Sequence, residues 1–380
     1  MSKTLSYGNW SVVMKYLDLN VRAFLAARAP SLQNIHQELP IKVVRLQLNP
    51  SSFVLNNIEH SFYTFMENTT GAELPLDMQL INLQGGQPFD LDNCGRQEPL
   101  GARLSGDLGL ASYVRYYRTP YPSTNPHYQY NSMRFPSGHK IRYIIREHLQ
   151  TMFTGPSIPI VKTLEIGMDN CVLRLPEGFK IQIRALQLEC TARSGLERLL
   201  PIIDESSFPL KKLTFGNTWS QDFVFQNEIV KTAESLDIAF FTIEGLVPSL
   251  LQMKNKIIHL SKYCISVIGF RKLAAGWVAV QKPLGTRLSM AAQFQFVRRL
   301  IENLEKKRKK QSENATKGDL YERRSPIEFL HCYTLAMDRT KELNFYIQKS
   351  PNYNREIEKK NGLPWDIYME VMKKGAAIPL

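Results

Sequence analysis

The chain has no long uninterrupted apolar run. The nearest candidate, residues 235–251, is interrupted by Asp237, Glu244 and Pro248, so it falls short of the roughly eighteen apolar residues that a spanning helix needs. The first residues also lack the basic-then-apolar layout of a secretory signal. We therefore expect no signal peptide, no membrane segment and no membrane partner.

Cysteine is scarce and widely spaced. The 380 residues contain only five cysteines, none of them in a C-x-x-C pair: Cys94, Cys171, Cys190, Cys264 and Cys332. An odd number of scattered cysteines without a secretory signal is typical of reduced thiols in the cytosol or nucleus. The predicted localisation is therefore cytoplasmic, nuclear or both.

Catalytic motifs are missing as well. The seven histidines share no H-x-x-x-H or H-E-x-x-H spacing, so the sequence offers no zinc site. It contains no G-x-S-x-G, P-loop or G-x-G-x-x-G pattern for acyl transfer or phosphate binding. We predict a protein that is not an enzyme, with no catalytic residue, no cofactor and no metal.

Positive charge is in excess, with 48 basic and 35 acidic residues and a net charge of +13. Much of it lies in one run that continues a predicted helix: Lys306, Lys307, Arg308, Lys309 and Lys310. The favoured interpretation is a solvated helix end, because cations stabilise a helix C-terminus. A nuclear-import signal or a polyanion contact is the alternative, and nucleic acid is not the expected partner.

Five leucine-centred strand signatures occupy the second half of the chain at nearly even spacing. Their central leucines lie 22, 27, 23 and 24 residues apart: Leu164, Leu186, Leu213, Leu236 and Leu260. This spacing is typical of leucine-rich repeats, in which each strand is followed by a helix. One such unit leaves an apolar face open, so neighbouring units must stack. The pattern predicts a recognition protein.

The rest of the chain divides by the period of its apolar residues. Residues 1–40 predict three short helices, the second capped by Asn20 and ended by Pro30, the third capped by Ser31 and ended by Pro40. The other predicted regions are a mixed strand and loop region (41–155), leucine-rich-like β–α repeats (156–285), and a long helix, a basic linker and a strand pair (286–380). The predicted fold class is α+β or α/β.

Three predictions concern stretches within these regions. Residues 71–140 indicate long loops and short strands, with Tyr113–Arg118 on a half-exposed strand or loop rather than a base-stacking surface. The long helix is expected over Met290–Lys310. The last thirty residues are expected to form a short helix or to fray.

Several stretches, taken in order, resemble a nematode-expanded family of F-box-like proteins with an F-box-associated C-terminal region. The matching positions are 5–7, 13–17, 22, 25, 28–32, 35 and 40, followed by 173–181, 201–203, 229–238, 255–260, 276–277 and 283–286. The resemblance spans most of residues 5–305. It departs from a true F-box at the opening Leu-Pro pair, since Ser6 follows Leu5, and Asp18 stands where an acidic residue is usual between the first two helices.

The resemblance implies a substrate-recognition protein of a cullin–RING ubiquitin ligase. Its N-terminal helices would bind a Skp-type adaptor, and its repeats would bind an unknown protein. The candidate adaptor-binding residues are Trp10, Val13, Met14, Leu17, Phe24 and Leu25. The same side chains could instead form the internal core of the three helices, leaving a degenerate F-box that caps an interaction scaffold. Nucleic-acid binding through the basic surface is a further alternative.

Overall fold

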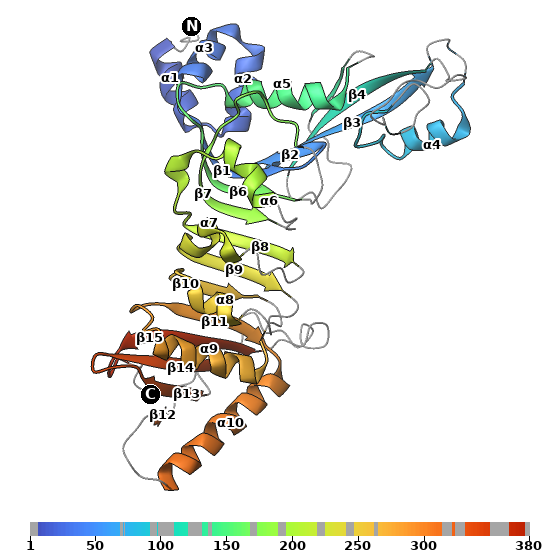
Figure 1. Ribbon diagram of the computed structural model, residues 1–380. Helices are drawn as coiled ribbons and strands as arrows, with labels where there is room; N and C mark the ends of the chain where they lie inside the picture. Colours follow the sequence, from blue (N-terminus) through green and yellow to red (C-terminus); the bar gives the residue numbers. More distant parts are fainter. Residues whose placement is uncertain are drawn as a thin grey trace. The chain divides into compact units, whose positions relative to one another are not determined.

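The computed structural model describes residues 7–68, 71, 73–91, 97, 110–120, 131–135, 139–167, 173–188, 195–218, 225–240, 247–261, 265–313, 321–323, 331–349 and 365–376. These residues mix helices and strands, so the fold class is α+β (Figure 1). The chain divides into two compact units. Unit 1 comprises Met1–Arg184 with Glu197–Ser207, and unit 2 comprises Ala185–Leu196 with Phe208–Leu380.

Unit 1 begins with the three predicted helices, which are α1 (Tyr7–Tyr16), α2 (Leu19–Arg28) and α3 (Pro30–Glu38). The predicted caps were wrong. Asp18 caps α2, because its carboxylate accepts a hydrogen bond from the Asn20 backbone N–H at 2.8 Å. Pro30 opens α3 instead of simply ending α2, and its fixed φ suits a first helical turn. Ser31 therefore lies inside α3.

The sheet of unit 1 follows the order β6-β1-β2-β3-β4-β5. Its strands are β1 (Lys42–Leu48), β2 (Ser52–Leu55), β3 (Ile58–Asn68), β4 (Leu110–Pro120), β5 (Asn131–Arg134) and β6 (Ile160–Ile166). Strands β1 and β6 pair in parallel, and the pairs β1–β2, β2–β3, β3–β4 and β4–β5 are antiparallel. Across the parallel pair the buried Leu46 lies opposite the buried Leu164. Leu46 therefore occupies the same position in β1 as the predicted central leucine occupies in β6.

Unit 1 also contains the helices α4 (Leu76–Leu83) and α5 (Ile141–Phe153). Helix α5 was predicted from its apolar spacing, and it contacts α2 and β3. The prediction for residues 71–140 was wrong in two places, because α4 is a helix and β4 is a long strand. The Tyr113–Arg118 segment lies in β4, but its side chains fall outside the described part. Short helical turns α6 (Gly195–Leu199), η1 (Leu200–Ile202) and η2 (Glu205–Ser207) come later in the chain.

The sheet of unit 2 combines a parallel and an antiparallel half. The parallel strands are β7 (Gln182–Leu188, of which Ala185–Leu188 belong to this unit), β8 (Lys212–Thr218), β9 (Ser235–Phe240), β10 (Ile257–Leu260) and β11 (Arg287–Ala292). The antiparallel strands follow in the order β15 (Trp365–Lys373), β14 (Lys341–Lys349), β13 (His331–Ala336) and β12 (Tyr321–Arg323). The predicted strand pair is thus present as β13 and β14.

Two rows of buried aliphatic and aromatic side chains run across the strands of unit 2. The first row is Leu186, Leu213, Leu236, Ile258, Leu288 and Met369, and the second is Leu188, Phe215, Ile238, Leu260, Met290 and Ile367. The predicted centre of the fifth strand was displaced by two positions, because Ile258 and not Leu260 aligns with Leu236. Burial of these rows provides the apolar core of the sheet.

Helices of unit 2 follow individual strands: α7 (Glu228–Thr232), α8 (Val247–Gln252), α9 (Val267–Ala279) and α10 (Phe294–Glu313). Helix α9 contacts strand β14, where the buried Phe270 makes an edge-to-face contact with Phe345 at 5.8 Å. The long helix begins later than predicted, because Met290 belongs to β11. The prediction of a helix or frayed end for the last thirty residues was wrong, since β15 is a strand between β11 and β14.

Candidate interaction surface and binding hollows

The three N-terminal helices share a small internal core. Met14 is 0% exposed and packs with the buried Leu32 and Ile35, and the surrounding partly buried side chains include Trp10, Leu17 and Leu25. Four of the six residues predicted to bind an adaptor therefore contribute to the interior of the helices. Their apolar stripe stabilises the module, because helices this short are marginal when isolated.

A second apolar surface faces outward on the same helices. Val12 is 59% exposed and Tyr16 is 82% exposed, one helical turn apart on α1, and Val13 of α1 and Val21 of α2 are exposed as well. We call these four residues the outer face. Of them, only Val13 was among the predicted residues. The sequence did contain a signal for Val12 and Tyr16, because their i, i+4 spacing places them on one side of α1. This side is opposite the stronger apolar stripe.

Phe24, the last predicted residue, is half-buried in α2. The guanidinium of Arg28 lies over its ring, 3.9 Å from the centroid. This cation–π contact is worth only about 0.5–1 kcal/mol at an exposed site. Phe24 is therefore only partly accessible to a partner, because Arg28 covers its ring.

The helices are tied to the sheet of unit 1 by buried hydrogen bonds. The side-chain amide of Asn20 donates to the Leu55 carbonyl oxygen at 2.9 Å, and its Oδ1 lies 2.7 Å from His60 Nε2. The His60 ring stacks on Phe53 with centroids 4.5 Å apart. At the surface, the side-chain amide of Asn56 donates to the Asp18 carboxylate. These contacts fix the start of α2 against β2 and β3.

A buried pair of basic side chains lies between α2 and α3. Arg22 is 4% exposed and His36 is 3% exposed. The Nε–H of Arg22 donates to His36 Nδ1 at 3.1 Å, and its Nη1 donates to the Pro40 carbonyl oxygen at 3.2 Å. Burial lowers the pKa of His36, the charge of Arg22 lowers it further, and the Thr151 backbone opposes both effects. Burial also lowers the pKa of Arg22.

This arrangement predicts a pH-dependent stability. Because the pKa of His36 is lower in the folded chain than its usual 6.5, the unfolded chain binds the proton more readily. The stabilisation is therefore complete above pH 6.5 and is lost as the pH falls below it, by at most about 1.4 kcal/mol per pH unit. Denaturant unfolding of the wild type and of His36→Gln between pH 7.5 and 5 measures this. A wild-type slope equal to that of the variant would contradict it.

Two hollows open beside the C-terminal end of α5 in unit 1. The first, which we call the His36 hollow, has a volume of about 280 Å³ and lies between α2, α3 and the end of α5. Its walls are small alanines of α2, and its polar lining consists of Gln33, His36, Gln37, Gln150, Thr151 and Thr154. Amide, hydroxyl and imidazole groups thus converge on a space of side-chain size.

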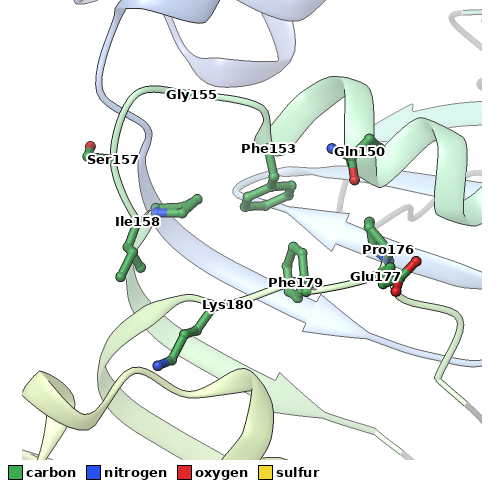
Figure 2. A pocket seen from close by; sticks show the side chains of 11 residues that line it. Gln150, Phe153, Gly155, Ser157, Ile158, Pro176, Glu177, Phe179 and Lys180 are labelled. Carbon is green, nitrogen blue, oxygen red and sulfur yellow. The ribbon is translucent and has the colours of Figure 1, made fainter.

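The second, which we call the Phe179 hollow, has a volume of about 240 Å³. Figure 2 shows the rings of Phe153, from the end of α5, and Phe179 pointing toward one another, with an edge-to-face contact at 5.5 Å. Ile158 lines the opposite side, and Lys180 at the rim lies 3.5 Å from the Asp204 carboxylate. This hollow suits one apolar side chain, because its charged groups stand at the edge.

The strands of unit 2 also present a polar, half-exposed face. Between the two buried rows, side chains point to the other face of the sheet in a third row, which is half-exposed except at the buried Ser289: Gln187, Thr214, Asp237, His259, Ser289 and Tyr368. Nδ1 of His259 lies 2.8 Å from Ser289 Oγ, and the Arg287 guanidinium lies over the Tyr368 ring at 4.5 Å. A flat row of mixed donors and acceptors is suited to a macromolecular partner.

The basic run Lys306–Lys310 lies in the second half of α10, as expected of a helix end. Its side chains fall outside the described part of the chain, so its proposed import or polyanion role stays a prediction. Within the described ranges, no group of His, Cys, Asp and Glu side chains could hold a metal ion. No helix in those ranges is long and apolar enough to cross a membrane.

Comparison with known proteins gives one finding. Residues 141–293 match a family described as a domain of unknown function (DUF3557). The match begins with α5 and ends just after β11, so it includes all residues that line the Phe179 hollow. No curated protein and no solved structure matches the chain.

Proposed function

We propose that this chain is a substrate-recognition protein of a cullin–RING ubiquitin ligase, belonging with the F-box-like proteins that its sequence resembles. In this proposal the outer face of α1 and α2 binds a Skp-type adaptor. The parallel strands act as an irregular leucine-rich-like stack that binds an unknown protein. The chain carries out no reaction of its own and works inside the cell, in the cytoplasm or nucleus.

The observation that carries the proposal is the outer face itself. Val12, Val13, Tyr16 and Val21 expose apolar surface on a module that already has its own core. Apolar groups that stay exposed on a module with its own core are typical of interaction sites, and an aromatic anchor such as Tyr16 is a frequent hot spot. The predicted contact set is therefore revised to these four residues and Phe24, with Trp10, Met14, Leu17 and Leu25 supporting them from inside.

The stack interpretation is supported by a repeated burial pattern. In β6 the buried apolar residues are Val161, Leu164 and Ile166, with two residues between the first and second and one between the second and third. The same spacing occurs in β1, at β7, at β8 and at β9: Val43-Leu46-Leu48, Ile183-Leu186-Leu188, Leu210-Leu213-Phe215 and Ala233-Leu236-Ile238. This spacing matches the L-x-x-L-x-L pattern of leucine-rich strands and so supports the stack interpretation.

A second candidate is a scaffold whose three helices only cap the sheet. It is favoured by the inward packing of Met14, Trp10, Leu17 and Leu25 and by the bonds of Asn20 to β2 and β3. Solenoids require such caps. The two candidates differ in one respect, which is whether the outer face has a partner.

Binding of the full-length chain to a purified Skp-type adaptor tests the proposal. Val12→Asp places a carboxylate in the outer face, and we expect it to weaken binding by about 2 kcal/mol or more, which is roughly thirtyfold. Val280→Asp is the matched control, because Val280 is 54% exposed but lies at the end of α9 in unit 2. Absence of binding by the wild type, or equal losses in both variants, would reject the adaptor role and leave the scaffold.

A further inference from the structure

Helix α4 presents three leucines to solvent. Leu76, Leu80 and Leu83 are all exposed, and Leu83 is exposed to 81%. They are spaced i, i+4 and i+7, so each lies beside the next on one side of the helix. A single exposed leucine is ordinary, but leucines that adjoin one another form an apolar patch of the kind found at interaction sites. We call these three residues the leucine stripe.

The opposite side of α4 is already packed against β3 (Figure 1). The buried Met78 packs with Met66 of β3 and with Leu91. The side-chain amide of Asn82 donates to the Met66 carbonyl oxygen at 2.8 Å, and its Oδ1 accepts from the Met66 backbone N–H at 3.0 Å. At about 100° per residue, Met78 and Asn82 point to one side of the helix and the leucine stripe points to the other. The leucine stripe therefore has no part in holding α4 on β3.

The charges that α4 and its flanking residues carry are all acidic. Glu73, shortly before the helix, and Asp77, in its first turn, are both exposed. Neither forms an ion pair within the described part of the chain. Residues 68–95 contain no lysine, arginine or histidine, although the whole chain has a net charge of +13. An apolar ridge with an acidic border thus stands out on a basic protein.

This combination of charge and spacing discriminates among three candidate occupants. A helix that binds an anionic membrane carries lysine or arginine beside its apolar face, and α4 carries neither. Symmetric pairing with the α4 of a second copy would bring the same acidic groups together, and like charges on neighbouring helices repel. A basic partner has neither disadvantage, because its cations would face Glu73 and Asp77.

We propose that the leucine stripe binds an amphipathic helix of another protein, one with an apolar centre and with lysine or arginine at its edge. The leucine stripe forms a ridge about 10 Å long, at 1.5 Å per residue, and such i, i+4 ridges pack into the groove of a facing helix. Glu73 and Asp77 orient the partner and disfavour acidic segments. This site lies on α4, whereas the outer face lies on α1 and α2, so it requires no adaptor.

Fluorescence anisotropy with two designed helical peptides tests the proposal on the full-length chain. Both peptides carry leucines on one face, and the other face carries lysine in one peptide and glutamate in its counterpart. The lysine peptide should bind about tenfold more tightly or better, even though the net charge of +13 attracts the glutamate peptide in general. Equal affinities, tighter binding of the glutamate peptide, or no binding of the lysine peptide would overturn the proposal.

Two variants and a control locate the interface. Leu80→Gln removes apolar surface, adds no charge and keeps a good helix former, so the lysine peptide should bind about tenfold more weakly. Glu73→Lys, outside the helix, should weaken the lysine peptide and strengthen the glutamate peptide. Leu284→Gln is the control, because Leu284 in unit 2 is 48% exposed and Leu80 is 47% exposed. Equal effects of Leu80→Gln and Leu284→Gln would place the peptide elsewhere and contradict the proposal.

The other two occupants have measurements of their own. Phosphatidylserine vesicles should bind the wild type and Leu80→Gln equally, and sedimentation of the two proteins should depend equally on concentration. A difference in the first would replace the basic helix by a membrane, and a difference in the second would replace it by another copy of the chain. Adaptor binding should be unchanged in Leu80→Gln, so failure of this proposal and failure of the adaptor role are separate results.

Discussion

Replacing Leu236 by alanine should lower the free energy of unfolding by about 2–5 kcal/mol, the range for truncating a fully buried leucine. Leu236 is at the centre of the first buried row, with Leu213 on one side and Ile258 on the other. Its loss leaves a cavity that the flanking strands are too constrained to fill. Denaturant unfolding of the full-length chain measures the change.

The matched control for Leu236→Ala is Ser235→Ala, one position earlier in β9. Ser235 lies on the half-exposed face of the same strand, so its truncation should change stability by no more than about 0.5 kcal/mol. Similar losses of stability in the two variants would show that the two faces of β9 do not differ in burial. That result would contradict the stacked rows described for unit 2.

The second large effect is expected for Asn20→Ala. Asn20 is 1% exposed, and its side chain joins α2 to the Leu55 carbonyl oxygen and to His60 Nε2. Removing it takes a buried partner from each group, and a buried polar group left unsatisfied costs about 1–3 kcal/mol. We expect a total loss of about 2–4 kcal/mol in the free energy of unfolding.

Asn34→Ala is the control for Asn20→Ala, because it makes the same substitution at an exposed position of α3. It should leave stability nearly unchanged. Hydrogen exchange adds a local measurement, since Asn20→Ala should speed exchange in α2 and β2 before the rest of the chain. A loss below about 0.5 kcal/mol for Asn20→Ala would contradict the linking role of this residue.

The buried rows of unit 2 were predictable because parallel pairing places equivalent residues side by side. The regular leucines of β6–β9 marked the strands correctly. The prediction placed the centre of the fifth strand wrongly because it looked for a leucine. Any aliphatic side chain can fill that buried position, and in the sheet Ile258 lies beside Leu236. Strand β1 was not recognised as similar because its partner β6 comes much later in the sequence.

The sequence of β15 contains a strand pattern that the prediction of a helix or frayed end overlooked. Ile367, Met369 and Val371 are all buried and alternate with partly exposed residues, which is the period of a strand with one covered face. The prediction missed this alternation because most of the residues before the segment are polar. Its pairing with both β11 and β14 depends on long-range contacts that no local window contains.

The candidate sites could be predicted only in part. The stronger apolar stripe of α1, which includes Met14, packs inward because a three-helix module buries its most apolar surface first. The weaker face, with Val12 and Tyr16, is therefore the exposed one. The His36 hollow combines α2 and α3 with the end of α5, which lies more than a hundred residues later in the sequence, and no spacing rule connects the two regions.

The central claim is that the outer face of α1 and α2 binds a Skp-type adaptor. Hydrogen exchange of the full-length chain, measured with and without the adaptor, tests it most directly. The account predicts slower exchange in residues 7–28 when the adaptor is present and no change in β13, β14 and β15. Unchanged exchange in residues 7–28 at saturating adaptor would contradict the account, and protection confined to another segment would move the interface there.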